Sequence, residues 1–302
     1  PNGWCLGEWS TPHNRIEIPA SLVNTAYFYH VTCIMADVAG ILNKKNDEHH
    51  LRTLAETIRK NFNAAFYNEA THHYGEGKQG ADVFALAFGL VPDGKREKVF
   101  AALLGHLEKV NYHFDTGILA TPLLLQVLTE NGRADLAYKL MNQRDFPSYG
   151  YLADKKNNTL WETWNGDGND EGCGHCHPMF GSVVAWFYHS LAGIKPDQSD
   201  PGMKHFYIEP MIVPDLKYCR ATYDSQYGKI SSDWKIDENG NLNIKIEVPA
   251  NTSATVIIPD WGGRTVLESG KPVSEVSNIV IDKVDSAWME VSSGVYHFVI
   301  LK

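Results

Sequence analysis

The spacing of apolar residues changes once along this chain, near residue 195, and this change limits the possible folds more than any other feature. From about residue 20 to 193 apolar residues recur at i, i+4 and i+8, which predicts amphipathic helices. After Gly193 prolines become frequent and the apolar spacing shortens to two, which predicts strands. A length of 302 residues leaves room for two domains. We therefore predict a helical domain at 1–195 and a β domain at 196–302.

The helical part is expected to contain about seven helices. Leu54, Ile58 and Phe62 mark one buried face, and breaks rich in glycine or proline separate the segments. The expected helices cover residues 20–42, 47–66, 79–90, 94–109, 116–131, 133–143 and 178–192. Because strand signals are scarce between them, the pattern fits an all-α bundle or a part of a larger helical toroid, and periodicity does not choose between the two.

The β part shows the alternation of a strand with one buried face. Leu242, Ile244 and Ile246 alternate with polar residues, and Asn239-Gly240 just before them is a hairpin turn signal. Further short strands are expected at 206–212, 229–236, 254–258, 279–281 and 296–301. Short strands at this spacing predict an antiparallel sandwich.

Charge and hydropathy exclude two classes of partner. The formal net charge is -9, the sequence pI is near 5.8, and no Lys/Arg cluster interrupts the acidic balance. A nucleic-acid partner is therefore not expected, since binding to a phosphate backbone depends on clustered positive charge. Membrane insertion is not expected either, because no run of about 18 apolar residues occurs.

The start of the chain and its cysteines bear on its origin. The chain begins with Pro1 without an initiator methionine, so we expect its start to have been processed, cut or engineered. The five cysteines are odd in number and irregularly spaced, which does not indicate a disulfide framework. The compartment stays open, and a periplasmic or secreted location is compatible with these features.

One segment combines a carboxylate with aromatic rings. Glu162 lies between Trp161 and Trp164, and an acidic, glycine-rich run follows at 165–172. Indole faces beside a single carboxylate suit a site that grips a sugar ring and activates water. The structural alternative is an exposed loop glutamate beside two core tryptophans. Like charges in the acidic run are expected to raise the pKa of Glu162.

The same segment offers two alternative interpretations as a metal site. The run from Cys173 to His177 carries Cys-x-x-Cys spacing, as a zinc site would. A structural zinc site needs four ligands, and completion would have to come from Cys5, Cys33 or His189. Asp167, Asp170 and Glu171 suggest calcium, but their spacing does not follow the known loop pattern. We therefore expect no metal.

A series of short motifs carries a family resemblance. In their order along the chain they resemble bacterial α-L-rhamnosidases of glycoside hydrolase family 78, over essentially the whole length. The motifs are Gly7-Glu8-Trp9, Asn24-Thr25-Ala26-Tyr27, Gly89-Leu90-Val91-Pro92, Asp115-Thr116-Gly117-Ile118, Gly132-Arg133-Ala134-Asp135-Leu136-Ala137-Tyr138, Thr159-Leu160-Trp161-Glu162, His175-Cys176-His177-Pro178-Met179-Phe180-Gly181, Leu191-Ala192-Gly193-Ile194, Asp200-Pro201-Gly202 and Pro249-Ala250-Asn251-Thr252.

The resemblance implies a fold and a reaction. The catalytic domain of this family is a six-hairpin (α/α)6 barrel of twelve helices, so the expected helices would be its later part. The family hydrolyses terminal α-L-rhamnose with inversion, using one general acid and one general base and neither a metal nor an organic cofactor. Glu162 matches the base. The acid motif of the family lies upstream and has no match here, so the chain alone is expected to be inactive.

The resemblance also implies substrate-binding residues. Trp9 matches an aromatic that lines the sugar pocket, and His177 matches a histidine that bonds a sugar hydroxyl or orients the base. Trp161 is favoured over Trp164 for stacking on the methyl face of rhamnose. Glu8 stands where the family has aspartate, so either a substrate hydroxyl contact or a structural cap is altered.

Other functions stay open at this point. Cys176 stands where relatives often have asparagine, which removes an amide donor and acceptor from the motif. The departures at Glu8 and Cys176 leave room for a catalytically inactive carbohydrate-binding homologue. An (α/α)6 enzyme for another sugar is the further alternative. The partner expected in each case is a carbohydrate, rhamnose-containing in the leading interpretation, and the β domain is expected to serve as a structural cap.

Overall fold

The computed structural model describes residues 7–13, 18–155, 159–165, 174–258, 263–277, 279–283 and 288–302. The chain divides into two compact units, Pro1–Val183 and Val184–Lys302. The first holds most of the helices and the second holds the strands, so the change in apolar spacing corresponds to a real change of architecture. The domain boundary at 195/196 stays a prediction.

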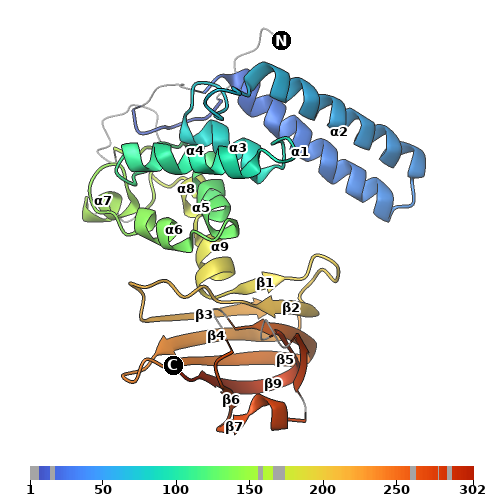
Figure 1. Ribbon diagram of the computed structural model, residues 1–302, viewed down its shortest axis with the longest axis vertical. Coiled ribbons are helices and arrows are strands. Elements are labelled where there is room, and N and C mark those ends of the chain that lie inside the picture. The colour runs from blue at the N-terminus through green and yellow to red at the C-terminus, as the bar shows by residue number, and fades with distance from the viewer. Residues whose placement is uncertain are drawn as a thin grey trace. The chain divides into compact units, whose positions relative to one another are not determined.

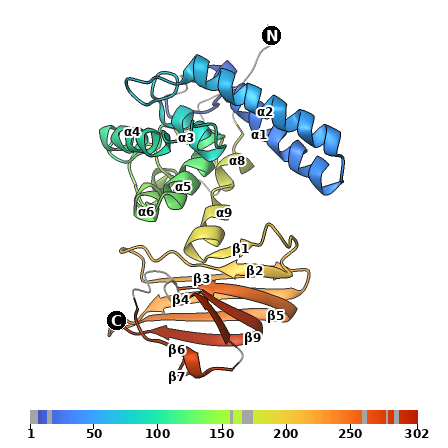
Figure 2. The same ribbon diagram turned by 45° about the vertical axis from the view of Figure 1, so that its right-hand side comes forward.

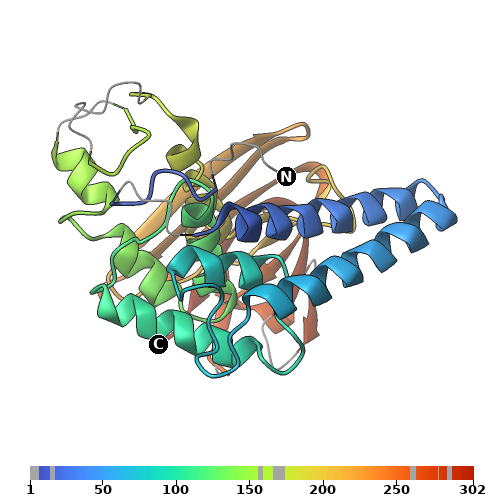
Figure 3. The same ribbon diagram turned by 90° about the horizontal axis from the view of Figure 1, so that it is seen from above.

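The first unit is helical (Figure 1). Its helices are α1 (Ala20–Ile41), α2 (Lys45–Phe66), α3 (Gln79–Ala87), α4 (Arg96–Lys109), α5 (Ala120–Glu130), α6 (Ala134–Met141), α7 (Tyr149–Asp154) and α8 (Pro178–Gly181). The two longest, α1 and α2, run side by side as a hairpin in Figures 1 and 3. The first six expected helices are present, each within a few residues of its expected bounds.

The structure differs from expectation at the end of the helical pattern. In place of one helix over 178–192 there are three short pieces: α8, α9 (Val184–Trp186) and the π-helical turn η1 (Phe187–Leu191). The first break is the turn at Ser182 and Val183, where Ser182 Oγ donates to Met179 O, a local bond that competes with the helical ladder. The short helix α7 was not expected, and its N-terminus is capped by Ser148 Oγ, which accepts from Tyr151 N.

A cluster of aromatic rings forms the interior beneath the candidate site. Trp164 stacks on Phe114 with ring centroids 5.1 Å apart, and it meets Tyr149 edge-on at 5.4 Å. Phe180 of α8 closes the cluster, 4.6 Å from Trp164. These rings come from segments far apart in the sequence, so they fix the loop of Trp164 against α7 and α8.

The second unit contains a nine-stranded sheet (Figure 2). Its strands are β1 (Ile194–Pro196), β2 (His205–Ile208), β3 (Tyr218–Ser225), β4 (Gly228–Ile236), β5 (Leu242–Ile257), β6 (Val266–Glu268), β7 (Lys271–Pro272), β8 (Ile279–Lys283) and β9 (Trp288–Ile300), with a 3-10 turn η2 (Val273–Glu275). The long strands β5 and β9 pair antiparallel, with an irregularity in register between Val248 and Ser253.

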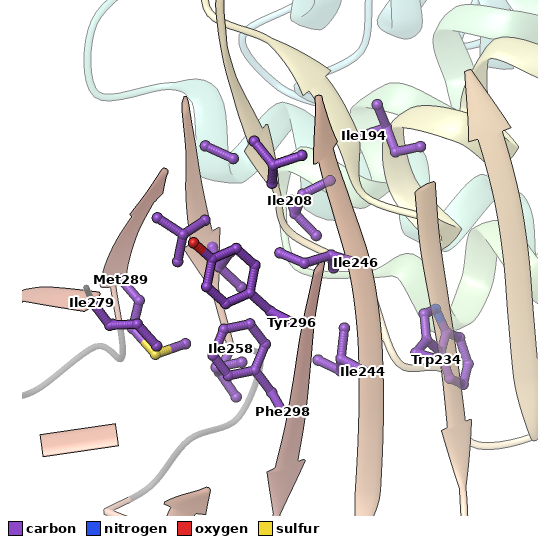
Figure 4. Close-up of a cluster of buried hydrophobic side chains, with 14 of the residues drawn as sticks. Ile194, Ile208, Trp234, Ile244, Ile246, Ile258, Ile279, Met289, Tyr296 and Phe298 are labelled. Carbon is purple, nitrogen blue, oxygen red and sulfur yellow. The ribbon is translucent and has the colours of Figure 1, made fainter. Parts of the chain in front are cut away.

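The sheet is mixed instead of purely antiparallel. The first half of β5 pairs antiparallel with β4, and its second half, Ser253–Val256, pairs parallel with β2. The register irregularity in β5 lets one long strand serve two partners in succession. Apolar side chains from these strands gather in one core that includes Trp234, Ile246 and Phe298 (Figure 4).

The sheet also holds the residues that lead into it. Trp234 Nε1 of β4 donates to Leu191 O at 2.7 Å, and Ser232 Oγ donates to Ala192 O at 2.6 Å. Gly193 follows with φ +76°, and a Cβ there would lie 2.2 Å from the carbonyl carbon of Glu209. The turn into the sheet therefore requires glycine.

Among the helices that the structure describes, none has the length and hydropathy of a membrane-spanning segment.

Candidate active site

Two short segments run side by side and bring the predicted site residues together. Glu162 N donates to Gly174 O at 2.9 Å, and His177 N donates to Leu160 O at 2.9 Å. Thr159 Oγ1 adds a hydrogen bond to His175 O. Glu162 and His177, separated by many residues in the sequence, therefore lie at one place. Residues 166–173 between the segments lie outside the described residues.

The Glu162 carboxylate is held by a donor at each oxygen. Trp9 Nε1 donates to Oε1 at 2.8 Å, and Gly174 N donates to Oε2 at 2.8 Å. The Gly174 hydrogen bond lowers the pKa of Glu162 most, and the Trp9 hydrogen bond and the charge of His177 lower it further. The expectation of a raised pKa was wrong: donors bonded directly to the charged form outweigh desolvation, and residues 166–172 of the acidic run, to which the expectation referred, lie outside the described residues.

His177 faces this carboxylate from the start of α8. It occupies the N-cap position of that helix, and Pro178 begins the helix. Its Nδ1 atom is buried and has no hydrogen-bond partner among the residues that the structure describes. A buried ring nitrogen without a partner is costly, so it is available to a ligand hydroxyl or a water molecule.

The two tryptophans beside Glu162 have different environments. Trp164 is 1% exposed, and its Nε1 donates to Thr116 O at 2.9 Å. Trp161 is only partly buried and stacks on His175, with ring centroids 3.9 Å apart and an angle of 7° between planes. Trp164 is therefore a core residue, and of the two tryptophans Trp161 is the one with a partly exposed ring.

Glu8 lies against the loop before α5 and the first residue of that helix. Its Oε1 accepts from Gly117 N at 2.6 Å and from Ala120 N at 3.0 Å, while its Oε2 is buried without a partner among the described residues. Burial raises the pKa of Glu8 to about 8 although both hydrogen bonds lower it. The side chain, 1% exposed, occupies the position that the cap interpretation predicts. A substrate contact by Glu8 stays a prediction.

The loop before α5 is a part of the site that the sequence interpretation did not single out. Gln79 Nε2 donates to His113 O at 2.9 Å, and Gln79 Oε1 accepts from Asp115 N at 2.9 Å. Thr116 and Thr121 share a hydrogen bond of 2.7 Å between their hydroxyls. The sequence did contain a signal for this loop, the motif Asp115-Thr116-Gly117-Ile118. It contributed to the family resemblance, but no function was predicted for its residues.

The candidate metal ligands divide between described and undescribed residues. Cys5, Cys173, Asp167, Asp170 and Glu171 lie outside the described residues. Within the described residues no group of three or more His, Cys, Asp or Glu side chains is arranged to hold a metal ion. Cys33 and Cys176 are both free thiols.

A helical unit that presents a hydrogen-bonded carboxylate beside surface aromatics, followed by a β unit, matches the six-hairpin glycosidases. Residues 1–191 match the model of the bacterial alpha-L-rhamnosidase six-hairpin glycosidase domain, and residues 193–271 match the bacterial alpha-L-rhamnosidase C-terminal domain. The chain belongs to the bacterial α-L-rhamnosidase family. The resemblance and the fold class stated from the sequence are thereby confirmed.

Curated relatives carry the name α-L-rhamnosidase. One from Streptomyces avermitilis is 36% identical over 259 residues, which is 84% of this chain and 24% of the relative. One from Formosa agariphila is 29% identical over 306 residues, which is 97% of this chain and 33% of the relative. The chain thus spans 24% to 33% of the length of these relatives.

Solved structures agree with this assignment. The α-L-rhamnosidase of Streptomyces avermitilis complexed with L-rhamnose superimposes with a TM-score of 0.85 at 33% identity, covering 97% of this chain and 28% of that one. The α-L-rhamnosidase from Dictyoglumus thermophilum gives a TM-score of 0.88 at 32% identity, covering 99% of this chain and 34% of that one.

Proposed function

We propose that this chain forms part of an inverting glycoside hydrolase that removes terminal α-L-rhamnose from glycosides or polysaccharides, with Glu162 as the general base. In such a reaction a carboxylic acid protonates the leaving oxygen, and a carboxylate about 6.5 to 9.5 Å away activates water on the opposite face of the sugar. The proposal assigns the general acid to a segment outside these 302 residues. The chain by itself is then expected to turn over little or no substrate.

The environment of the Glu162 carboxylate is the observation that carries the proposal. The hydrogen bonds from Gly174 and Trp9 lower its pKa, so the group is ionised at neutral pH, as a general base must be before it takes a proton. A carboxylate offers about four lone-pair sites, and the two donors leave capacity for a water molecule. The side chain is only partly buried, so water has access to it.

Three residues around this carboxylate are assigned to the sugar. The His175 ring fixes the orientation of Trp161, whose partly exposed indole is suited to the methyl-bearing face of rhamnose. Trp9 lies within hydrogen-bond distance of Glu162 and forms a wall of the same site. His177 Nδ1, which has no hydrogen-bond partner in the described part of the chain, is assigned to a sugar hydroxyl. A related structure from Streptomyces avermitilis holds L-rhamnose, which supports this choice of sugar.

The test is release of p-nitrophenol from its α-L-rhamnoside. Two proteins are compared, the 302-residue chain and a version extended upstream through the presumed acid segment, each with and without Glu162→Gln. We expect turnover only in the extended protein. Loss of the base is expected to reduce it by about 10²- to 10⁴-fold, since that is the usual contribution of acid–base assistance.

The other outcomes separate the alternatives. Rhamnose binding without turnover in a folded extended protein would reject hydrolysis and favour the inactive carbohydrate-binding homologue. Turnover of a different deoxy sugar or of a uronic acid, with the rhamnoside untouched, would favour an (α/α)6 enzyme for another sugar. Full activity in Glu162→Gln would remove Glu162 as the base.

A further inference from the structure

One turn, residues 115–120, touches both sides of the hydrogen bond between Trp9 and Glu162. On the first side Ile118 N donates to Trp9 O at 2.9 Å. On the second side Thr116 O accepts from the indole of Trp164, two residues after Glu162, at 2.9 Å. Trp9 and the loop that carries Glu162 are therefore both hydrogen-bonded to the same short piece of backbone.

Glu8 fastens this turn on the Trp9 side. Its Oε1 accepts from the N–H groups of Gly117 and Ala120, so the carboxyl spans the turn from its third residue to the start of α5. The turn lies so close that a Cβ at Gly117 would sit 2.0 Å from Trp9 O. Glu8 and Trp9 are adjacent in sequence. The position of the Trp9 indole therefore depends on two contacts with the turn, those of the Glu8 carboxyl and that of Ile118 N with Trp9 O.

We propose that Glu8 is a positioning residue for the general base, which acts through the 115–120 turn and Trp9 to hold the Trp9 indole N–H on Glu162. This role differs from a contact with substrate, because the Glu8 side chain is buried. The chemical purpose rests on the proposed function, since a base matters only if Glu162 takes a proton from water. The mechanical link between the two glutamates can be measured independently of any substrate.

In the described structure Tyr27 faces Glu8, and His177 faces Glu162. Burial first, and the Glu8 carboxyl after it, raise the pKa of Tyr27 to about 12. Neither group connects Glu8 to Glu162. The hydrogen-bonded route from Glu8 to Glu162 that the structure shows runs through the turn and Trp9.

The experiment is NMR spectroscopy of the 302-residue chain. The Trp9 indole N–H resonance is assigned by its loss in Trp9→Phe, and the Glu162 side-chain carboxyl is assigned by Glu162→Gln and titrated. Glu8→Leu keeps the size but removes the acceptor. We expect it to move the Trp9 resonance and to raise the Glu162 pKa toward its ordinary value, by up to about one unit, or tenfold in proton affinity.

Two further variants serve as controls. Glu8→Gln keeps an acceptor at the position of Oε1, so both readouts are expected to stay at their wild-type values. Asp82→Asn alters another buried carboxylate that accepts a backbone N–H, but its hydrogen bonds go to Tyr74 and His73 instead of the turn. It is also expected to leave the Glu162 titration unchanged.

The outcomes decide the proposal in either direction. A folded Glu8→Leu with an unmoved Trp9 resonance and unchanged Glu162 titration overturns it, and so does an equal shift in Asp82→Asn. If Glu8→Leu does not fold, Glu8→Asp takes its place. This change draws the carboxylate back by one methylene and should give a smaller shift in the same direction, and its absence counts against the proposal equally. Failure of the proposed function is read separately, from turnover by Glu162→Gln in the extended enzyme.

Discussion

At the scale of single residues, the three tryptophans near Glu162 do three different things. Trp9 donates to the carboxylate, Trp161 lies at the surface on His175, and Trp164 is buried and bonded to Thr116 O. Their residue type is the same, and their roles follow from where the backbone places each indole N–H. An indole N–H that reaches a carboxylate lowers its pKa, whereas one that reaches a buried carbonyl stabilises the fold.

The different roles of Trp161 and Trp164 predict different costs of substitution. Trp164→Phe leaves Thr116 O unpaired in the interior, so we expect a loss of about 1–3 kcal/mol in the free energy of unfolding, in addition to the lost ring volume. Trp161→Phe, at the surface, should change the free energy by no more than about 0.5 kcal/mol. Urea denaturation followed by circular dichroism measures both, and equal losses would contradict the assignment of Trp164 to the core.

Glu8 predicts how stability depends on pH. Its folded pKa of about 8 lies above the ordinary 4.5, so the folded state holds a proton that the unfolded state has released between these values. Its contribution to stability is full below about pH 4.5 and is lost as the pH rises toward 8, at up to about 1.4 kcal/mol per pH unit.

The measurement is the free energy of unfolding between pH 5 and 8 in wild type and in Glu8→Gln. We expect the decline with pH to be shallower in the variant, because glutamine does not titrate. Asp82 also has a raised pKa and adds a decline of its own, so the difference between the two proteins is the quantity to compare. Parallel curves would show that Glu8 titrates near its ordinary value.

At the scale of elements, the loop before α5 is organised by backbone groups. Four of its backbone groups bond side chains from distant segments: His113 O, Asp115 N, Thr116 O and Gly117 N. A backbone that satisfies its donors and acceptors in this way is fixed without belonging to a helix or strand. The loop in turn bonds Trp9, since Ile118 N donates to Trp9 O.

Glycines in two elements give a matched test of this organisation. Gly117→Ala would put a Cβ 2.0 Å from Trp9 O, so we expect it to displace Trp9 and to destabilise the first unit. Gly105→Ala, within α4, meets nothing within 4 Å and should stabilise by about 0.5–1 kcal/mol through helix propensity. Thermal unfolding compares the two, and a neutral Gly117→Ala would mean that the close approach relaxes freely.

At the scale of the whole chain, the sequence predicted most of the architecture but little of the site's geometry. Apolar spacing identified the first six helices, and alternation identified the first half of β5. The parallel pairing of β2 with β5 carries no local signal, since strand register depends on partners distant in sequence. The bond of Gly174 N to Glu162 was missed for the same reason, because a backbone donor has no signature of residue type.

The helix α1 carries a second apolar face that predicts how the isolated chain behaves. Phe28, Val31, Met35, Val38 and Leu42 are all at least 40% exposed, and they repeat at alternating steps of three and four residues. This is the spacing of a helix that packs against another helix along a seam. Beside it a cavity of about 300 Å³ is lined by Met35, Val38 and Leu42.

We expect this face to make copies of the chain associate as the concentration rises, because water disfavours so continuous an apolar stripe. Val31→Glu with Val38→Glu should reduce association without loss of helical circular dichroism. Ala36→Glu, on the buried side of α1, should instead unfold the hairpin. Sedimentation velocity over a range of concentrations is the measurement, and a wild-type chain that stays monomeric throughout would contradict the prediction.

The hydrogen bonds from β4 to the residues before the sheet have a consequence for anyone who wishes to exchange modules between relatives. Leu191 O and Ala192 O are bonded by Trp234 and Ser232, and Gly193 has room only for hydrogen against Glu209. A chimaera spliced at the change of hydrophobic period would inherit these carbonyls from one parent and their donors from the other. A splice ahead of Val184 keeps the carbonyls and their donors in one parental sequence. The last helical turns, from Val184 to Leu191, are therefore best transplanted together with the sheet.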